Sequence, residues 1–128
     1  MIPQNDALIA IKIPEGITYI GNQALYSNIN LKSIELPESL ERSGYEVFSQ
    51  CRGLSHIEFP DKYDMKGYGI MNFCTSLTSV KLPKNLECID ENAFYGCIAL
   101  SGITLPESLT EIKANAFRNS GLTSIELP

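Results

Sequence analysis

Three cysteines recur at one interval, and they are the first residues that could do chemistry. Cys51, Cys74 and Cys97 lie 23 residues apart, with Asn28 and Ser120 at the equivalent places before and after them. If the interval is structural, their Cα atoms stack about 5 Å apart, which allows a disulfide between two of them. A metal site is disfavoured because this spacing does not match that of zinc ligands. We favour small residues buried under a turn, with free thiols, and keep the disulfide as the alternative.

The single histidine belongs to a second series that could suggest catalysis. Ser33, His56 and Ser79 share one column. The next outward column contains charged and polar residues: Lys12, Glu35, Glu58, Lys81, Thr104 and Glu126. A Ser/His/Glu triad needs a buried carboxylate and an oxyanion hole, which an open sheet face lacks. We therefore predict no catalytic residues and assign Lys12, Glu35, His56, Glu58 and Lys81 to a solvated face that can bind a ligand.

Tyrosines near the middle of the chain form a second candidate surface. Tyr45 and Tyr68 share one column, and Tyr63 lies between them in sequence. Exposed tyrosines are frequent anchors in recognition, so these three are candidate ligand-binding residues. The alternative is that tyrosine replaces leucine here and packs in the core.

These series are part of a repeat that covers nearly the whole chain. A leucine recurs every 23 residues from Leu8 to Leu100, and Leu122 follows after 22. Six of the seven prolines share one column: Pro14, Pro37, Pro60, Pro83, Pro106 and Pro128. We predict repeats at 8–30, 31–53, 54–76, 77–99 and 100–121, with a partial repeat at 122–128. One repeat cannot bury its own apolar face, so the repeats must stack.

Each repeat predicts a strand, a second extended segment and a compact turn. Alternating apolar residues in L-x-x-I-x-L indicate a short strand, which the following proline ends because it has no N–H. Pairs such as Ala93-Phe94 and Ala116-Phe117 predict one helical or 3₁₀ turn. The repeats are thus expected to pair in parallel as a right-handed solenoid.

The pattern S-I-E-L-P-E-S-L, with N-A-F at 92–94 and 115–117, resembles the BspA-like, or Treponema pallidum-type, leucine-rich repeats. The resemblance covers residues 8–128 and implies an α/β-repeat solenoid with strands on one face. It also implies a binding scaffold at the cell surface or in a secreted protein. Repeat 54–76 departs from the pattern, since Tyr63, Lys66 and Met71 replace leucine, isoleucine and phenylalanine.

The composition disfavours some classes of binding partner. The 128 residues carry a net charge of −5, which disfavours nucleic acid and anionic membranes. No apolar run is long enough to span a bilayer, so we expect no membrane insertion. The start of the chain does not resemble a signal peptide, because Asp6 and Lys12 interrupt it.

We therefore predict a non-catalytic scaffold that binds a protein or glycan and needs no cofactor or metal. The alternative is a structural spacer or a self-assembling array without a specific ligand. Terminal repeats expose an apolar face unless they are capped. We accordingly expect this chain to be a fragment of a longer array or to pair end to end with another copy.

Overall fold

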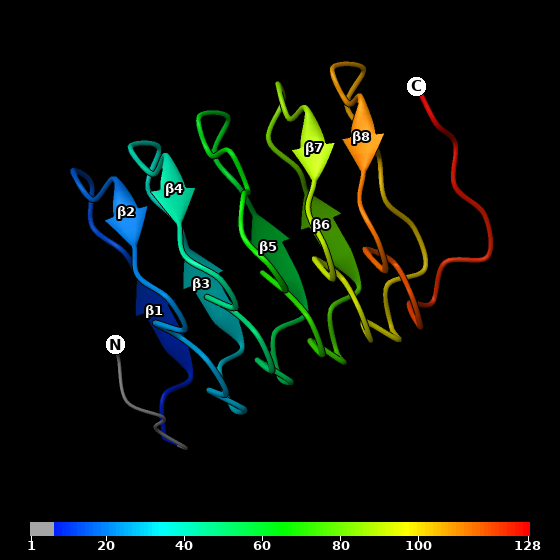
Figure 1. Ribbon diagram of the computed structural model, residues 1–128. Helices are drawn as coiled ribbons and strands as arrows, with labels where there is room; N and C mark the ends of the chain where they lie inside the picture. The colour runs from blue at the N-terminus through cyan, green and yellow to red at the C-terminus, as the bar shows by residue number, and fades with distance from the viewer. Residues whose placement is uncertain (1–6) are drawn as a thin grey trace.

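The computed structural model describes residues 7–128 as a stack of short strands and turns (Figure 1). The strands lie in two rows, which run from the blue end of the stack to its red end. The first row contains β1 (Ala10–Lys12), β3 (Ser33–Glu35), β5 (His56–Glu58) and β6 (Ser79–Lys81). The second row contains β2 (Tyr19–Ile20), β4 (Arg42–Ser43), β7 (Cys88–Ile89) and β8 (Glu111–Ile112).

Strands pair in parallel with the equivalent strand of the adjacent repeat. The pairs are β1 with β3, β2 with β4, β5 with β6, and β7 with β8. Ile11 lies opposite Ile34, and Ile57 lies opposite Val80. The predicted leucine-rich repeat architecture with short parallel strands is therefore confirmed.

The prolines explain why the strands of the first row are short. Four prolines each follow a strand of this row by two residues, and each accepts through its carbonyl a hydrogen bond that closes a turn: Pro14, Pro37, Pro60 and Pro83. Leu40 N–H donates to Pro37 O at 3.1 Å, and Tyr63 N–H donates to Pro60 O at 3.0 Å. Proline has no N–H for the ladder, so the chain turns toward the second row at the same point of each repeat.

The core consists of the repeated apolar columns. The leucine that begins each of four repeats is fully buried: Leu31, Leu54, Leu77 and Leu100. Complete burial of such a side chain stabilises the fold by about 1.5–3 kcal/mol. The first strand row, the second strand row and the turns each contribute side chains to this one apolar cluster. The core therefore supports the strand face from beneath along the stack.

The compact segments are turns and not the predicted helical or 3₁₀ turns. Within residues 7–128 there is no helix, and two columns of each repeat have positive φ angles. These columns contain Gln23, Glu46, Gly69, Asn92 and Asn115, and then Ser27, Gln50, Phe73, Gly96 and Asn119. A left-handed residue cannot continue a right-handed helix, which is why the segment coils as successive turns.

Hydrogen bonds between the turns connect all five repeats. In the second repeat, N–H groups of Glu46, Phe48 and Gln50 donate to carbonyls of the third at 2.8–3.0 Å. The first strand row is less continuous, because no backbone hydrogen bond within residues 7–128 joins β3 to β5. The stack is thus held together along its turns, while β3 and β5 lie side by side without a backbone hydrogen bond between them.

Asp90 connects three repeats on the side of the second strand row. Its carboxylate accepts the Gly67 N–H at 3.0 Å and pairs with Lys113 Nζ at 3.0 Å. Partial burial is the largest single influence on the Asp90 pKa, and it raises this pKa because it opposes ionisation. The hydrogen bonds from Gly67, Lys113 and Glu91 together outweigh it, so the Asp90 pKa is lowered. This contact reinforces a region where the third repeat has no strand in the second row.

Candidate functional site

The predicted ligand-binding face lies on the first strand row. The central residue of each strand is buried or half-buried, and the side chains on either side of it point outward, because strand residues alternate between faces. Lys12, Glu35, His56, Glu58 and Lys81 are all exposed, as predicted. The structure thus brings these five residues together on one surface.

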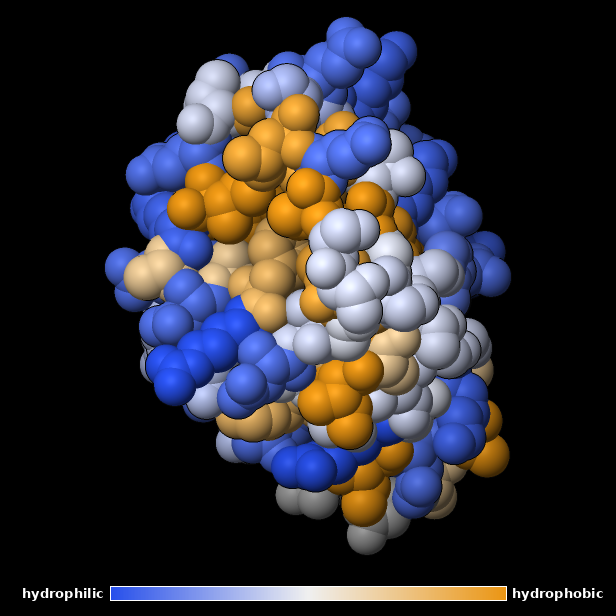
Figure 2. All heavy atoms as spheres, turned by 90° about the vertical axis from the view of Figure 1, so that its right-hand side faces the viewer, coloured by the Kyte–Doolittle hydropathy of each residue, from blue (hydrophilic) through white to orange (hydrophobic). Residues whose placement is uncertain are grey.

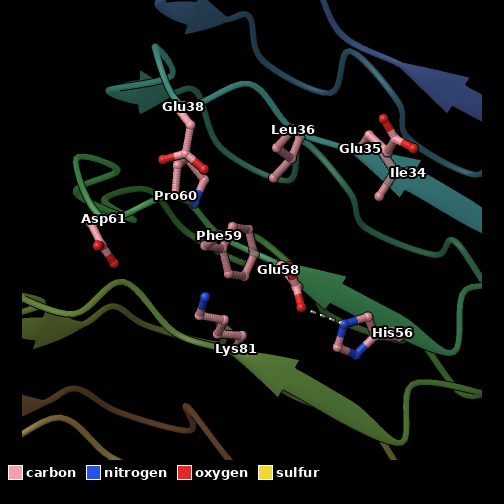
Figure 3. Close-up of a pocket in the computed structure, with 10 residues that line it drawn as sticks. All are labelled: Ile34, Glu35, Leu36, Glu38, His56, Glu58, Phe59, Pro60, Asp61 and Lys81. Carbon is pink, nitrogen blue, oxygen red and sulfur yellow. Dashed lines mark ion pairs between the residues drawn. The ribbon is translucent and has the colours of Figure 1, made fainter.

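A hollow of about 390 Å³ opens on this face between β3 and β5 (Figure 3). Leu36, Phe59 and Pro60 also line it, but Phe59 and Pro60 are buried and only Leu36 is half-buried. Glu35 and Glu58 line it from the strands, and Lys81 reaches it from β6. The hollow lies where the strand ladder is interrupted, so it is bounded by strand edges that are not paired with each other.

Two lining residues were not among the predicted site residues. Glu38 and Asp61 follow the prolines at the end of β3 and β5 and contribute two further carboxylates to the hollow. The sequence contains a signal for them, because the same column is charged in every repeat: Glu15, Glu38, Asp61, Lys84 and Glu107. This column extends the charged face beyond the strands.

Ion pairs organise part of the face. Lys12 Nζ lies 3.7 Å from Glu35 Oε2, and His56 Nε2 lies 3.5 Å from Glu58 Oε1. These side chains are more than half exposed, so each pair contributes at most about 1 kcal/mol to stability. Their carboxylates therefore stay accessible to a ligand.

The structure brings a serine, the histidine and a glutamate together. His56 Nδ1 lies 2.5 Å from Ser79 Oγ, and its other ring nitrogen faces Glu58. The carboxylate is 65% exposed, and His56 is also open to water. A triad requires a buried carboxylate and donors for an oxyanion. The arrangement is instead a polar chain across the strand face.

The three candidate tyrosines separate into two groups. Tyr45 and Tyr68 are 45% and 46% exposed, and Tyr68 Oη accepts a hydrogen bond from Asn92 Nδ2 at 2.6 Å. Tyr63 is only 1% exposed and stacks on Phe59 with 5.1 Å between ring centroids. The prediction that Tyr63 binds a ligand is therefore wrong, because it occupies the buried position that leucine fills in neighbouring repeats.

The cysteine column forms a ladder of buried thiols. Cys51, Cys74 and Cys97 each donate through Sγ to a carbonyl of the preceding repeat at 3.1–3.2 Å. All three are free and fully buried, which confirms the prediction of small residues under a turn. Burial raises the pKa of Cys51 to about 11 and that of Cys97 to about 12, and it raises the Cys74 pKa well above its ordinary value.

We expect the four thiols to differ sharply in reactivity. At pH 8, a thiol reagent such as Ellman's reagent should modify Cys88 first, because only Cys88 is partly exposed. The other three should react only after denaturation, since burial both blocks access and suppresses the thiolate. Stopped-flow absorbance measures the rates, and Cys88→Ser should remove the fast phase. Two fast thiols in the folded protein would contradict the ladder.

Other features of residues 7–128 bear on the choice of function. No group of three or more histidine, cysteine, aspartate or glutamate residues in this range is placed to hold a metal ion. Over the same range, none of the chain forms a helix with the length and apolar character needed to cross a membrane.

Apolar side chains gather at the end of the stack beyond β8 (Figure 2). Ile125 and Leu127 are exposed there, and end-to-end pairing stays a prediction.

Comparison with known proteins gives one family and several similar structures. The model of the BspA-type leucine-rich repeat region matches residues 4–123 in six copies. No curated protein matches the chain. A Treponema pallidum leucine-rich repeat protein is 21% identical with a TM-score of 0.56, over 82% of this chain and 73% of that protein.

Two other solved structures share the fold. A leucine-rich repeat protein from Bacteroides ovatus is 24% identical with a TM-score of 0.50, over 94% of this chain. A leucine-rich cell surface protein from Faecalibacterium prausnitzii is 17% identical with a TM-score of 0.57, over 88% of this chain. The chain spans 43% and 52% of these two proteins. Similarity at this level of identity demonstrates the fold alone.

Proposed function

This chain belongs to the BspA-type leucine-rich repeat family, and from that premise we propose that it is a non-catalytic scaffold whose strand face binds a protein or glycan. The observation that carries this proposal is the exposed charged face above a continuous buried core. A core that fixes the strands also fixes the spacing of the side chains they present, which lowers the entropy cost of recognition.

The location we propose is the cell surface or the extracellular space. One solved structure with this fold is described as a cell surface protein, which supports the same location for this chain. A role in adhesion follows from that location and from the binding face. The net charge of −5 supports a partner other than nucleic acid.

A non-catalytic role is supported by the geometry around His56. The Ser79, His56 and Glu58 side chains are all exposed, so water competes for each hydrogen bond. The family match indicates a repeat scaffold and no enzyme family. The second candidate, a structural spacer, is supported by the turn hydrogen bonds that continue along the stack.

Binding to arrays of extracellular proteins and glycans tests the choice between scaffold and spacer. The double variant Glu35→Lys/Glu58→Lys should lose a specific interaction, because it reverses two charges on the strand face. The matched control is Glu87→Lys/Glu91→Lys, which changes the net charge equally at exposed positions away from that face. Circular dichroism should verify that both variants fold. Equal binding by both variants would contradict recognition by the strand face, and no specific binding by the unaltered chain would favour the spacer.

A further inference from the structure

We propose that the stack bends at the junction between its second and third repeats, so that residues 7–53 and residues 54–121 move as two blocks. This inference goes beyond the proposed function, because it holds whatever the strand face binds. It depends on three observations: the strand pairing at each junction, the backbone of the third repeat and the continuity of the turns.

Strand pairing distinguishes this junction from the others between the five repeats. The first and second repeats are paired in both strand rows, through β1 with β3 and β2 with β4. The third and fourth repeats are paired in the first row through β5 and β6, and the fourth and fifth in the second row through β7 and β8. Within residues 7–128, neither row is paired between the second and third repeats. Because each repeat of a solenoid contacts only its neighbours, this junction lacks the ladder that aligns the others.

The backbone of the third repeat explains why the second row is interrupted there. Tyr19 and Arg42 are exposed on this row, whereas Met65 at the equivalent position is fully buried. Met65 has a φ of 55°, and Gly67 follows with a φ of 128°. A left-handed residue cannot continue a strand, so the chain turns the Met65 side chain into the core. Methionine is flexible and fills a core of changing shape better than a branched side chain does.

The third repeat is fastened to the fourth more firmly than to the second. On the side of the fourth repeat, Gly67 N–H donates to the Asp90 carboxylate at 3.0 Å, in addition to the pairing of β5 with β6. On the side of the second repeat, Asp64 N–H donates to Glu41 O at 3.0 Å. No ion pair within residues 7–128 crosses that second junction. The third repeat therefore belongs to the C-terminal block.

The turns keep the two blocks attached. Backbone hydrogen bonds of 2.8–3.0 Å join the turn of the second repeat to that of the third, from N–H groups of Glu46, Phe48 and Gln50. Cys74 Sγ donates to Phe48 O at 3.1 Å on the same side. The backbone contacts of this junction are thus concentrated at the turns, which places the axis of bending there.

The interior of the junction is mainly apolar. The Phe48 and Phe59 rings lie 6.2 Å apart and are inclined by 51°, and the hydroxyls of Ser43 and Tyr63 are hydrogen-bonded to each other. A hydrogen bond requires a narrow range of angles, whereas apolar burial is non-directional. A change of tilt therefore costs less at this junction than where a strand ladder must break.

Bending about the turns changes the strand face at one place. Within each block the ladder fixes the spacing of neighbouring side chains, as for Lys12 with Glu35 and His56 with Ser79. Across the junction, the spacing of Glu35 and Glu58 varies, and with it the width of the hollow that they line (Figure 3). A ligand that contacts both blocks would select one degree of bending.

Residual dipolar couplings of backbone N–H groups in the unaltered full chain test the bend. We expect residues 7–53 and 54–121 to require two alignment tensors of different magnitude, because blocks that reorient separately average their couplings differently. Dividing residues 54–121 at residue 77 should give tensors of equal magnitude, because β5 and β6 are paired across that point. One tensor that fits all of residues 7–121 would overturn the proposal.

A disulfide across the unpaired strand row then locates the axis. Residues 35 and 58 occupy the same column of adjacent repeats, so their Cα atoms lie about 5 Å apart, within the range of a disulfide. Oxidised Glu35→Cys/Glu58→Cys should abolish the difference between the two tensors, and reduction should restore it. The matched control is Glu58→Cys/Lys81→Cys, which joins β5 to β6 within one block and should leave the difference unchanged. Equal effects of the two disulfides would contradict an axis at the turns, and the unaltered chain decides the proposal if either disulfide fails to form.

Discussion

Phe59→Ala is expected to lower the free energy of unfolding by about 3–5 kcal/mol, the usual cost of removing a buried aromatic ring. Phe59 is 2% exposed and contacts two other rings, stacking on Tyr63 at 5.1 Å and lying 6.2 Å from Phe48. Alanine would leave a cavity beneath the hollow and remove the support of Tyr63, whose hydroxyl is hydrogen-bonded to Ser43. Urea unfolding followed by circular dichroism measures the change.

Phe59→Leu is the matched control. Leu36 and Leu82 occupy the same column in the adjacent repeats, so a leucine fits this position in the repeat. We expect it to cost about 1–1.5 kcal/mol, because most of the volume is retained. A loss below about 1 kcal/mol for Phe59→Ala would show that the three rings do not pack as described.

Gly96→Ala should lower the free energy of unfolding by about 2–4 kcal/mol, through backbone strain and overpacking together. Gly96 has a φ of +74°, a conformation that L-residues adopt at a cost. A Cβ at this position would also lie 2.6 Å from Cδ1 of Phe73. The Phe73 ring cannot move freely, because it packs edge-on against Tyr95 with 5.2 Å between the ring centroids.

Two further variants separate these causes. Gly102→Ala is the control, since a Cβ at residue 102 has no atom within 4 Å, and its effect should stay within about 0.5 kcal/mol. Phe73→Asn in the Gly96→Ala background removes the ring and puts a residue that tolerates left-handed backbone at position 73. It should make the Gly96→Ala substitution less costly than in the unaltered chain. If Gly96→Ala is as harmless as Gly102→Ala, the left-handed turn is not formed as described.

The repeat predicted the architecture because each column has one physical requirement. A proline that ends a strand and a leucine that fills the core can be recognised without the structure. The turn conformation was missed because the two left-handed columns hold different residue types. Their enrichment in asparagine and glycine, as at Gly69, Asn92, Gly96 and Asn115, was the available signal.

The candidate site was predicted in part. The exposed strand positions followed from alternation, which fixes the face of Glu35 and Glu58 once the strand is recognised. The hollow was not predictable, because it depends on an interruption between β3 and β5 that no residue type marks. Tyr63 was misassigned because an aromatic side chain suits both a core and a recognition surface, and only packing against Phe59 distinguishes them.

The direction of the turn hydrogen bonds has a consequence for synthesis on the ribosome. N–H groups of Glu46, Phe48 and Gln50 donate to carbonyls that come later in the chain, at Tyr68, Ile70 and Asn72. While the polypeptide emerges from the exit tunnel, each newly made turn therefore lacks its acceptors until roughly one more repeat has been translated. Folding of the nascent chain should follow elongation with a lag of one repeat, so the most recently exposed turn is always the least protected.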